Sequence, residues 1–438
     1  MPLVSAEEVG SLAAQLAHSD GLRVARIGID FDPFDFARTG APLVDRAVAY
    51  SMPDGDRLVG LGTAWHATSS GPDRFSDLSE SIEGLPDPSL TVFLGYSFLD
   101  EQTPNGLWTN FAPAEAFVPR IGIHRIDGRS TLTVVIPEGE DADRTLGLLA
   151  GMRRPDWVPV VDFGDHQIES RPPVGDWAHL VADAVTTIGA GDLDKVVLAR
   201  SVKVESSEAV AILRVFRQLV TAYPDCYNFA WKSGPSVFMG ASPELLAEVR
   251  GGQFRSNPLA GSARRGEGED EDDAIGIALL TSSKDRNEHQ LVVDDMRERL
   301  SGIVDDLTIP DIPALKRMAT VQHLSTLITG TVPVGTSVLD TVAALHPTPA
   351  VAGVPTVRAV DYIREHEHLD RGWYTGGIGW MAPTGDGAVA IALRCGLVSD
   401  STTHLFAGAG IVADSDPAAE LLETRLKLRP LLELVAST

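Results

Sequence analysis

Cysteine is scarce in this chain, which contains only Cys226 and Cys395 among its 438 residues. Two cysteines provide neither a disulfide framework nor the spaced pairs of a structural zinc site. We therefore expect a reducing compartment and a cytoplasmic protein.

Positive charge is also in short supply. The chain has 36 Lys and Arg against 61 Asp and Glu, a formal net charge of −25. Nucleic acid and anionic membrane both require a basic face, so neither is an expected partner. An anionic substrate must therefore be held by a few well-placed cations, with or without a metal ion.

Long hydrophobic runs are absent. Stretches such as "AVAIAL" are far too short to span a bilayer. The first residues have no basic segment followed by an apolar one, as a secretory signal would. Instead, Ser5 and Glu8 have the spacing of a capping box that opens an amphipathic helix.

The signals along the chain change near residue 165. Residues 1–165 give mixed strand and helix patterns without a catalytic constellation, and residues 175–438 carry the informative motifs. The turn formers in 160–177 could join these two parts. With 44% hydrophobic and 22% charged residues, the composition is that of an ordinary folded protein.

Periodicity and turn residues predict the elements of the second part. The expected elements are a helix from Trp177 and a strand from Lys195, a helix over 209–223, strands over 236–261, a loop over the acidic run 266–273 that leads into a helix, a helix over 282–300, a hairpin over 371–399 turning at 383–387, a strand with a Gly/Ala bend over 403–412, and a last helix capped by Asp416 with Pro417 at its first position. This pattern favours an α+β architecture with antiparallel sheets.

Two pairs of acids stand three residues apart near predicted helix starts. Glu420 and Glu423 form one pair, and Asp285 and Glu288 form the other. A single such pair is more often a solvated acidic face. Two helices that each present two carboxylates can instead build an oxygen-ligand site for Mg²⁺, which binds one or two carboxylates and leaves other positions to water and substrate.

Several other side chains are open to two interpretations. Arg394, at the end of a strand of small residues, can grip a carboxylate bidentately or pair with a surface acid. Lys195 begins an apolar strand, where a desolvated amine can act as a base but more commonly extends to solvent. Glu244 can be an acid held at a strand end or a turn residue, and His323 can be a satisfied loop histidine or a core histidine.

Taken in order, the motifs resemble those of the chorismate-utilising enzymes, and most closely the isochorismate synthases. The motifs are "KVVLAR", "GASPELL", "NPLAGSARRG", "SSKDRNEHQLVVDDM", "VQHLST", "LHPTPAVAGVP", "RGWYTGGIGW", "ALRCG" and "AGAGIVADSDPAAELLETRLK". The resemblance implies a two-lobed chorismate-binding α+β fold, with antiparallel sheets packed face to face, helices outside and a site between the lobes.

The resemblance also implies roles for the charged residues. Glu288 and Glu423 match the metal ligands, and Asp285 and Glu420 match carboxylates that reach the Mg²⁺ through water. Lys195 matches the base that deprotonates water at ring carbon 2. Glu244 matches the acid that protonates the hydroxyl leaving carbon 4. The implied reaction is the isomerisation of chorismate to isochorismate. Further residues match positions that contact substrate: Gly261, Ser262, His323, Ala350, Tyr374, Arg394, Gly408, Gly410 and Lys427.

The resemblance separates several alternatives. Members that use ammonia have an amide where Lys195 stands, and a lysine nucleophile found in some relatives is replaced here by Ala260. Salicylate synthases share Lys195 and Glu244; Ala350 favours an isochorismate synthase over them, whereas Tyr374 also occurs in salicylate synthases. A catalytically silent binding protein would not need the base and the acid. We expect a monomer without an amidotransferase partner; the pathway that it supplies, menaquinone, siderophore or salicylate, stays open.

Overall fold

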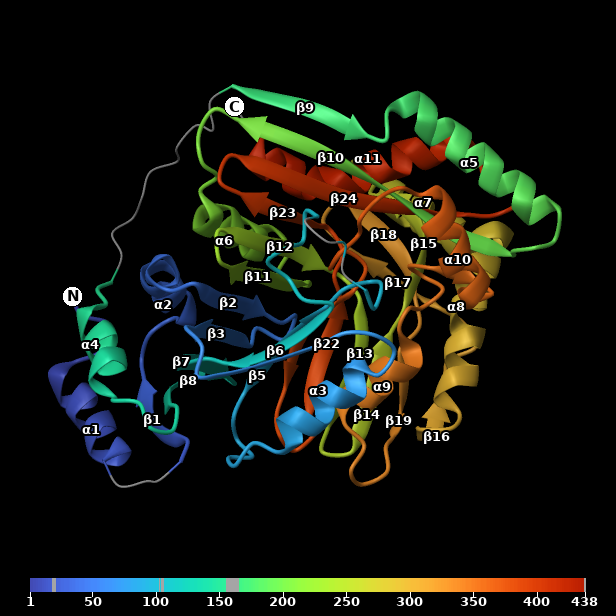
Figure 1. The fold of residues 1–438 in the computed structure, drawn as a ribbon. Helices are drawn as coiled ribbons and strands as arrows, with labels where there is room; N and C mark the ends of the chain where they lie inside the picture. Colours follow the sequence, from blue (N-terminus) through green and yellow to red (C-terminus); the bar gives the residue numbers. More distant parts are fainter. Residues whose placement is uncertain (18–20, 102, 104–105, 155–164, 437–438) are drawn as a thin grey trace.

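The computed structural model describes residues 1–17, 21–101, 103, 106–154 and 165–436. Its largest element is a twelve-stranded sheet to which both sequence parts contribute (Figure 1). In spatial order its strands are β1 (Arg23–Ile29), β8 (Arg129–Ile136), β7 (Ile121–Ile126), β3 (Arg57–Leu61), β2 (Arg46–Ser51), β11 (Tyr227–Ser233), β12 (Ser236–Ser242), β23 (Cys395–Ser399), β24 (Thr402–Ile411), β10 (Lys195–Ser206) and β20 (Gly353–Val354), with β9 (His166–Arg171) also paired to β10.

A second sheet has nine strands and a third has three. The nine-stranded sheet runs β16 (Asp305–Thr308), β19 (Ile328–Thr331), β14 (Gln253–Asn257), β13 (Leu245–Arg250), β22 (Gly387–Ile391), β21 (Gly377–Met381), β5 (Val92–Tyr96), β6 (Ala114–Val118) and β4 (Trp65–Ser69), and the small sheet runs β15 (Leu259–Arg264), β18 (Val321–Ser325) and β17 (Ala314–Arg317). The named strand pairs are all antiparallel, as the hairpin pattern predicted.

The two large sheets pack face to face through an aromatic core. Phe117 of β6 meets Trp231 of β11 edge to face, with 5.0 Å between ring centroids. Trp231 in turn meets Trp373 at 5.1 Å. Such aromatic pairs add to the stability gained from the area they bury. This packing confirms the expected α+β arrangement of antiparallel sheets.

Helices cover the outside of the sheets. They are α1 (Ala6–Leu16), α2 (Pro33–Gly40), α3 (Arg74–Glu83), α4 (Asp143–Gly151), α5 (Val174–Gly189), α6 (Ile212–Ala222), α7 (Glu269–Thr281), α8 (Ser283–Leu300), α9 (Val338–Leu345), α10 (Thr356–His366) and α11 (Pro417–Val435). Figure 1 shows α5 and α11 lying along β10 and β24, and α8 beside the small sheet. These neighbours position the site described below.

Several local predictions are confirmed. Ser5 and Glu8 form the capping box of α1. The Asp416 side chain accepts hydrogen bonds from two backbone amides at the start of α11. On α8, the apolar residues at core spacing, Val292 and Met296 among them, are buried. Strands β21 and β22 form the predicted hairpin.

Other local predictions are wrong. The acidic run is not a loop, because α7 starts at Glu269, where acids in the first turn favour the helix dipole and Asp272 pairs with Arg265 at 2.7 Å. The Gly/Ala stretch is not a bend, because β24 runs through it in register with β10. Within the segment of turn formers, His166–Arg171 forms a strand, because β10 offers it an antiparallel edge. Residues 160–164 lie outside the described residues, and the role of this segment as a connection between the two parts stays a prediction.

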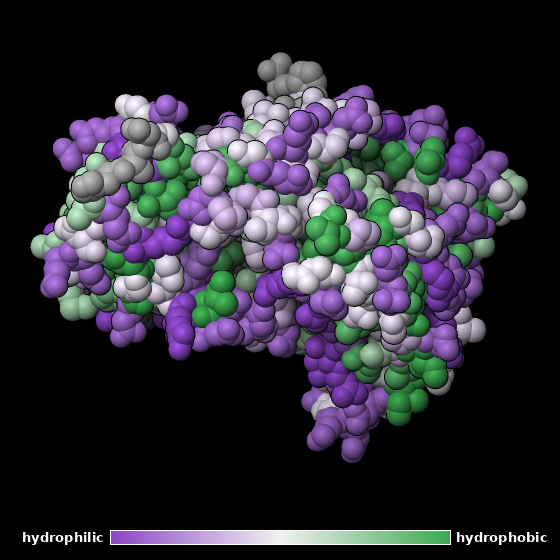
Figure 2. All heavy atoms as spheres, turned by 90° about the horizontal axis from the view of Figure 1, so that it is seen from below, coloured by the Kyte–Doolittle hydropathy of each residue, from purple (hydrophilic) through white to green (hydrophobic). Residues whose placement is uncertain are grey.

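The surface is mixed in character. On the face shown in Figure 2, hydrophilic residues are interspersed with smaller hydrophobic groups. Among the described residues, no helix is long and apolar enough to cross a membrane.

Candidate active site

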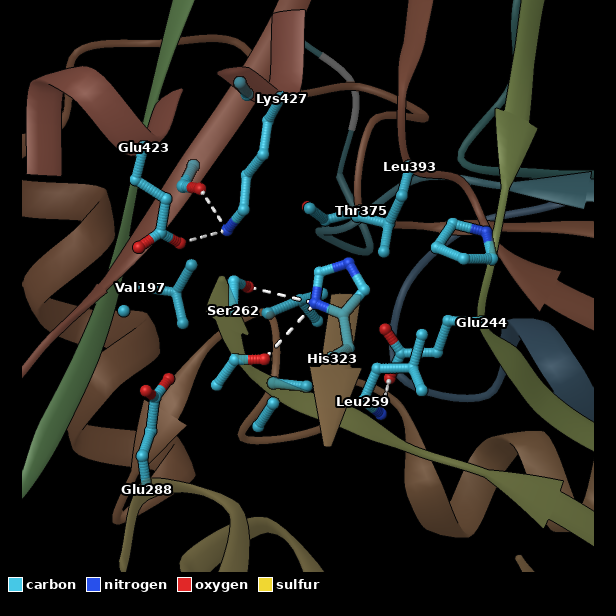
Figure 3. A pocket seen from close by; sticks show the side chains of 18 of the residues that line it. Val197, Glu244, Leu259, Ser262, Glu288, His323, Thr375, Leu393, Glu423 and Lys427 are labelled. Carbon is cyan, nitrogen blue, oxygen red and sulfur yellow. Dashed lines mark hydrogen bonds and ion pairs between the residues drawn. The ribbon is translucent and has the colours of Figure 1, made fainter. Parts of the chain in front are cut away.

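One pocket gathers all fifteen residues that the sequence singled out. They come from strands, helices and connections far apart in the chain: Lys195, Glu244, Gly261, Ser262, Asp285, Glu288, His323, Ala350, Tyr374, Arg394, Gly408, Gly410, Glu420, Glu423 and Lys427. In Figure 3, Glu288 and Glu423 lie on one side of His323 and Glu244 lies on the other. The predicted base and acid therefore share a cavity.

Lys195 lies at the start of β10, and its side chain is only 1% exposed. Its Nζ forms an ion pair of 2.9 Å with Glu288 Oε1, from α8. Burial opposes ionisation of Glu288, but the charge and hydrogen bond of Lys195, together with the charges of Lys427 and Lys284, lower the pKa of this carboxyl. The lysine is thus turned into the pocket, and does not extend to solvent.

A glycine in the neighbouring strand makes room for this pair. A Cβ at Gly410 of β24 would lie 2.7 Å from Glu288 Oε1 and 2.9 Å from Lys195 Cε. At Gly408, a Cβ would lie 2.8 Å from the Leu198 carbonyl oxygen. These glycines are therefore required for close approach within a strand, and not for a bend.

The four predicted metal-site carboxylates converge from α8 and α11. Burial, and next the charge of Glu423, raise the pKa of Glu420 to about 7. Burial also raises the pKa of Asp285, with contributions from Glu288 and Glu423. Glu423 Oε1 lies 2.5 Å from Lys427 Nζ, which also donates to the Gly408 carbonyl (Figure 3). The carboxyls of the two pairs, Asp285–Glu288 on α8 and Glu420–Glu423 on α11, therefore interact electrostatically.

This donor set suits a hard dication, although the described residues hold no ready-made cluster of three or more Asp, Glu, His or Cys around a metal position. Crowded carboxyls with a raised pKa, as at Glu420, are those expected where compensating positive charge is lacking. Two of the four carboxylates form ion pairs with lysines: Glu288 with Lys195 and Glu423 with Lys427. A bound Mg²⁺ would compete with these lysines for the same oxygens.

Glu244 lies at the opposite end, in the turn between β12 and β13. Its side chain is nearly inaccessible, and burial raises its pKa to about 7. The Leu259 amide donates a hydrogen bond of 3.3 Å to Oε1 (Figure 3), and more distant cations offset part of the burial effect. A carboxyl group that holds its proton near neutral pH is suited to act as a general acid.

His323 links Arg394 to Ser262 within the pocket. Its Nε2 lies 3.2 Å from an Arg394 guanidinium nitrogen, and its Nδ1 lies 2.9 Å from Ser262 Oγ. A guanidinium only donates, so Nε2 accepts and the proton belongs on Nδ1, which donates to Ser262. Burial, followed by the Arg394 charge, lowers the pKa of His323 well below its ordinary value. The imidazole is therefore neutral.

Arg394 does not end a strand as predicted, because β22 stops at Ile391. Arg394 lies in the connection to β23, with a left-handed φ of 48°. A residue with a side chain pays about 1 kcal/mol or more for such a conformation. The strained backbone turns this half-buried guanidinium towards His323 and the pocket.

The remaining predicted residues line the same cavity. Tyr374 stacks on Phe406, with 5.3 Å between ring centroids. Gly261 forms a bulge in β15 with φ of 71°, and a Cβ there would lie 3.2 Å from Asp285 Cβ. Ala350 lies in the connection between α9 and β20. Ala260, where a nucleophilic lysine was excluded, is also in the lining.

Sequence reasoning missed a buried ion pair beneath the pocket. Arg371 Nη2 contacts Glu367 Oε2 at 2.5 Å and donates to the Val197 carbonyl at 2.8 Å, while Nη1 donates to the Val351 carbonyl at 2.9 Å. The Glu367 carboxylate in turn accepts from the Ala199 amide at 2.7 Å. Val197 and Val351 line the pocket, so this pair fixes two of its walls.

The only sequence signal for that pair was the spacing of four residues between Glu367 and Arg371, which is common on protein surfaces. Lys284, beside Asp285, is a further cation in the pocket lining. It lay within a quoted motif but received no role.

Comparison with known proteins gives this architecture a family. The profile of the family described as "Chorismate binding enzyme" matches residues 14–436. The chain therefore belongs to the chorismate-binding enzyme family.

Several relatives with similar sequences or structures are isochorismate synthases. The chain is 36% identical over 399 residues to the salicylate biosynthesis isochorismate synthase of Pseudomonas aeruginosa, covering 86% of this chain and 82% of the relative. It is 32% identical to the isochorismate synthase MenF of Bacillus subtilis, covering 96% and 94%. Among solved structures, MenF from Escherichia coli, a menaquinone-specific isochorismate synthase, matches with a TM-score of 0.85 at 25% identity, covering 98% of both chains.

A protein named for another function has the same fold. Anthranilate synthase component I from Streptococcus pneumoniae matches with a TM-score of 0.72 at 22% identity, covering 86% of this chain and 92% of that one. This likeness concerns the fold alone.

Proposed function

We propose that this protein is an Mg²⁺-dependent isochorismate synthase, which converts chorismate to isochorismate. The observation that carries this proposal is that Lys195 and Glu244 line one pocket, which Arg394 and Lys427 also line as cations for a dianionic substrate. The names of the relatives, isochorismate synthases over most of the chain, support the same reaction.

The reaction is an allylic displacement. Water attacks ring carbon 2, the ring double bonds shift, and the carbon–oxygen bond at carbon 4 breaks. Lys195 acts as a base only in its neutral form, after the ammonium seen beside Glu288 has lost a proton to solvent. The neutral amine takes a proton from the attacking water, and Glu244 gives a proton to the leaving hydroxyl, which departs as water. Proton exchange with solvent then returns Lys195 and Glu244 to their starting forms. One water enters and one leaves, so the product is an isomer of the substrate.

Binding of the substrate depends on its two carboxylates. Arg394 can hold the enolpyruvyl carboxylate bidentately, with Tyr374 beside it. Lys427, His323 and the Gly261–Ser262 pair are proposed to lie at the ring carboxylate. Gly408 and Gly410 are proposed to present backbone groups to the ring.

Glu288 and Glu423 would hold the Mg²⁺, with Asp285 and Glu420 supporting it through water. When bound, the ion supplies positive charge that anchors a substrate carboxylate among these acids. Without it, the crowded carboxylates would repel the substrate. The metal binding site and the monomeric, partner-free state of the enzyme stay part of this proposal.

The runner-up is a salicylate synthase, which would go on to eliminate pyruvate from isochorismate. The test is incubation of purified protein with chorismate and MgCl₂, with products separated by chromatography at several times. We expect isochorismate to accumulate, in the absence of glutamine and ammonium. Early salicylate and pyruvate in equal amounts, above the decay of isochorismate in a control without enzyme, would overturn this choice.

A further inference from the structure

The turn that carries Glu244 is held from behind by a lysine outside the pocket lining. Lys316, on β17, donates a hydrogen bond of 2.7 Å from Nζ to the carbonyl of Pro243, the residue before Glu244. In the described part of the chain, this ammonium forms no ion pair with a carboxylate. A half-buried cation whose contact is a carbonyl beside the proposed acid needs an explanation.

The small sheet places this lysine by register. Lys316 of β17 stands opposite His323 of β18, which stands opposite Ser262 of β15. Ser262 and His323 line the pocket, whereas Lys316 does not. One row of residues across the small sheet therefore runs from Ser262 and His323, which line the pocket, to Lys316, which holds the turn that carries Glu244.

Charges around Glu244 make this support electrostatic as well as mechanical. After burial and the Leu259 amide, the charge of Lys316 is the next influence on the Glu244 carboxyl, ahead of Lys195 and Arg394. Lys195 already faces Glu288, and Arg394 faces His323. Lys316 is therefore the cation whose nearest polar contact belongs to the turn that carries the acid.

The groups around Lys316 itself are few. Burial lowers its pKa, while Cys226, Glu244 and Asp225 favour its charged form. Of these, the Cys226 thiol is neutral at ordinary pH, since burial raises its pKa to about 12, and Asp225 is exposed. Glu244 is thus the buried acid near this ammonium.

We propose that Lys316 is a positioning residue for the general acid: its hydrogen bond to Pro243 fixes the turn that carries Glu244, and its positive charge offsets the negative charge that Glu244 gains on giving up its proton. This inference rests on the proposed function of Glu244. Lys316 touches no substrate, so it acts on the rate of the proton transfer and not on binding.

The test compares Lys316→Met, Lys316→Gln and Lys316→Arg with the wild type. A matched control is Lys232→Met, because Lys232 is also half-buried and donates to backbone carbonyls, at Ala41 and Val44, away from the site. For Lys316→Met we expect kcat at pH 6.5 to fall by about five- to twentyfold, with KM within about twofold. In the pH profile of kcat/KM, the pH above which the rate falls (the alkaline limb) should rise by roughly 0.5 to 1 unit. The reason is that Lys316→Met removes a cation that lowers the pKa of Glu244.

The other variants separate the two roles. Lys316→Gln keeps a donor for Pro243 without the charge, so it should show the same shift of the limb with a smaller loss of kcat. Lys316→Arg should bring the limb back towards the wild-type pH, and Lys232→Met should leave limb and kcat unchanged. Wild-type kcat and an unmoved limb in Lys316→Met and Lys316→Gln would overturn the proposal, as would an equal effect in Lys232→Met.

A readout without turnover keeps this test apart from that of the reaction. The infrared band of the protonated Glu244 carboxyl, assigned by its loss in Glu244→Gln, can be titrated in each variant. Its midpoint should rise in Lys316→Met and Lys316→Gln, and an unmoved midpoint counts against the inference. A wild-type enzyme inactive on chorismate would overturn the proposed function without affecting this titration.

Discussion

The two ends of the pocket use the same residue type in opposite states. At one end Glu288 lies beside the Lys195 ammonium, which lowers the pKa of the carboxyl despite burial. At the other end Glu244 has a backbone amide and no ion-pair partner in the described residues, and burial raises its pKa to about 7. Two glutamates therefore differ in protonation because of their surroundings, which is how one site can hold both a cation and a general acid.

The largest expected effect comes from removing the metal ion proposed to bind at the end of the pocket that contains Glu288 and Glu423. Removing divalent metal with EDTA should abolish isochorismate formation, because Glu288, Glu423 and their neighbours would then face the substrate carboxylate without compensating charge. Adding excess Mg²⁺ should restore it, and EDTA loaded beforehand with Mg²⁺ is the control. Full activity in protein shown to be free of metal would contradict the proposed site.

Next in size is the loss of the base from the same end. Lys195→Ala should lower kcat by about 10²–10⁴-fold, the range typical of general base catalysis, and leave Mg²⁺-dependent binding of chorismate largely intact. Turnover is followed by chromatography and binding by calorimetry. Lys203→Ala, on the same strand but paired with Glu205 near the surface, is the matched control. Wild-type turnover in Lys195→Ala removes this lysine from the mechanism.

The smallest expected effect, and the sharpest for the comparison, is a pH dependence set by the Glu244 end. Glu244 must be protonated to act, and its pKa lies at about 7. At saturating Mg²⁺, kcat/KM should therefore fall about tenfold per pH unit above that value. Glu244→Gln should be slow and should lose this limb. A wild-type profile that stays flat up to pH 9 would show that the acid is another group.

Much of the site could be predicted because each motif kept its chemistry in a short segment. The three-residue spacing within Asp285–Glu288 and Glu420–Glu423 indicated a shared role, and the order of the motifs along the chain indicated the family. What failed were local conformations that depend on a distant partner. The Gly/Ala stretch is a straight strand because β10 pairs along it, and Arg394 has a left-handed backbone beyond the end of β22.

The buried supports were also beyond local reasoning. Glu367 and Arg371 look like any surface pair until the fold places them against β10 and the segment around Val351. Lys316 lies outside all of the motifs identified in the sequence. It gains its place beside the turn of Glu244 only because β17 and β18 pair in one register.

The amino-acid sequence by itself determined the family and the reaction class, and it named the charged residues that the fold brings into one pocket, because functional groups are a property of side chains. The roles of base, acid and anion-binding residues stay predictions. Only the tertiary structure decided which carboxyl holds a proton and which holds a cation. That choice depends on desolvation and on charges from segments far away in the chain, and both exist only once the sheets have packed.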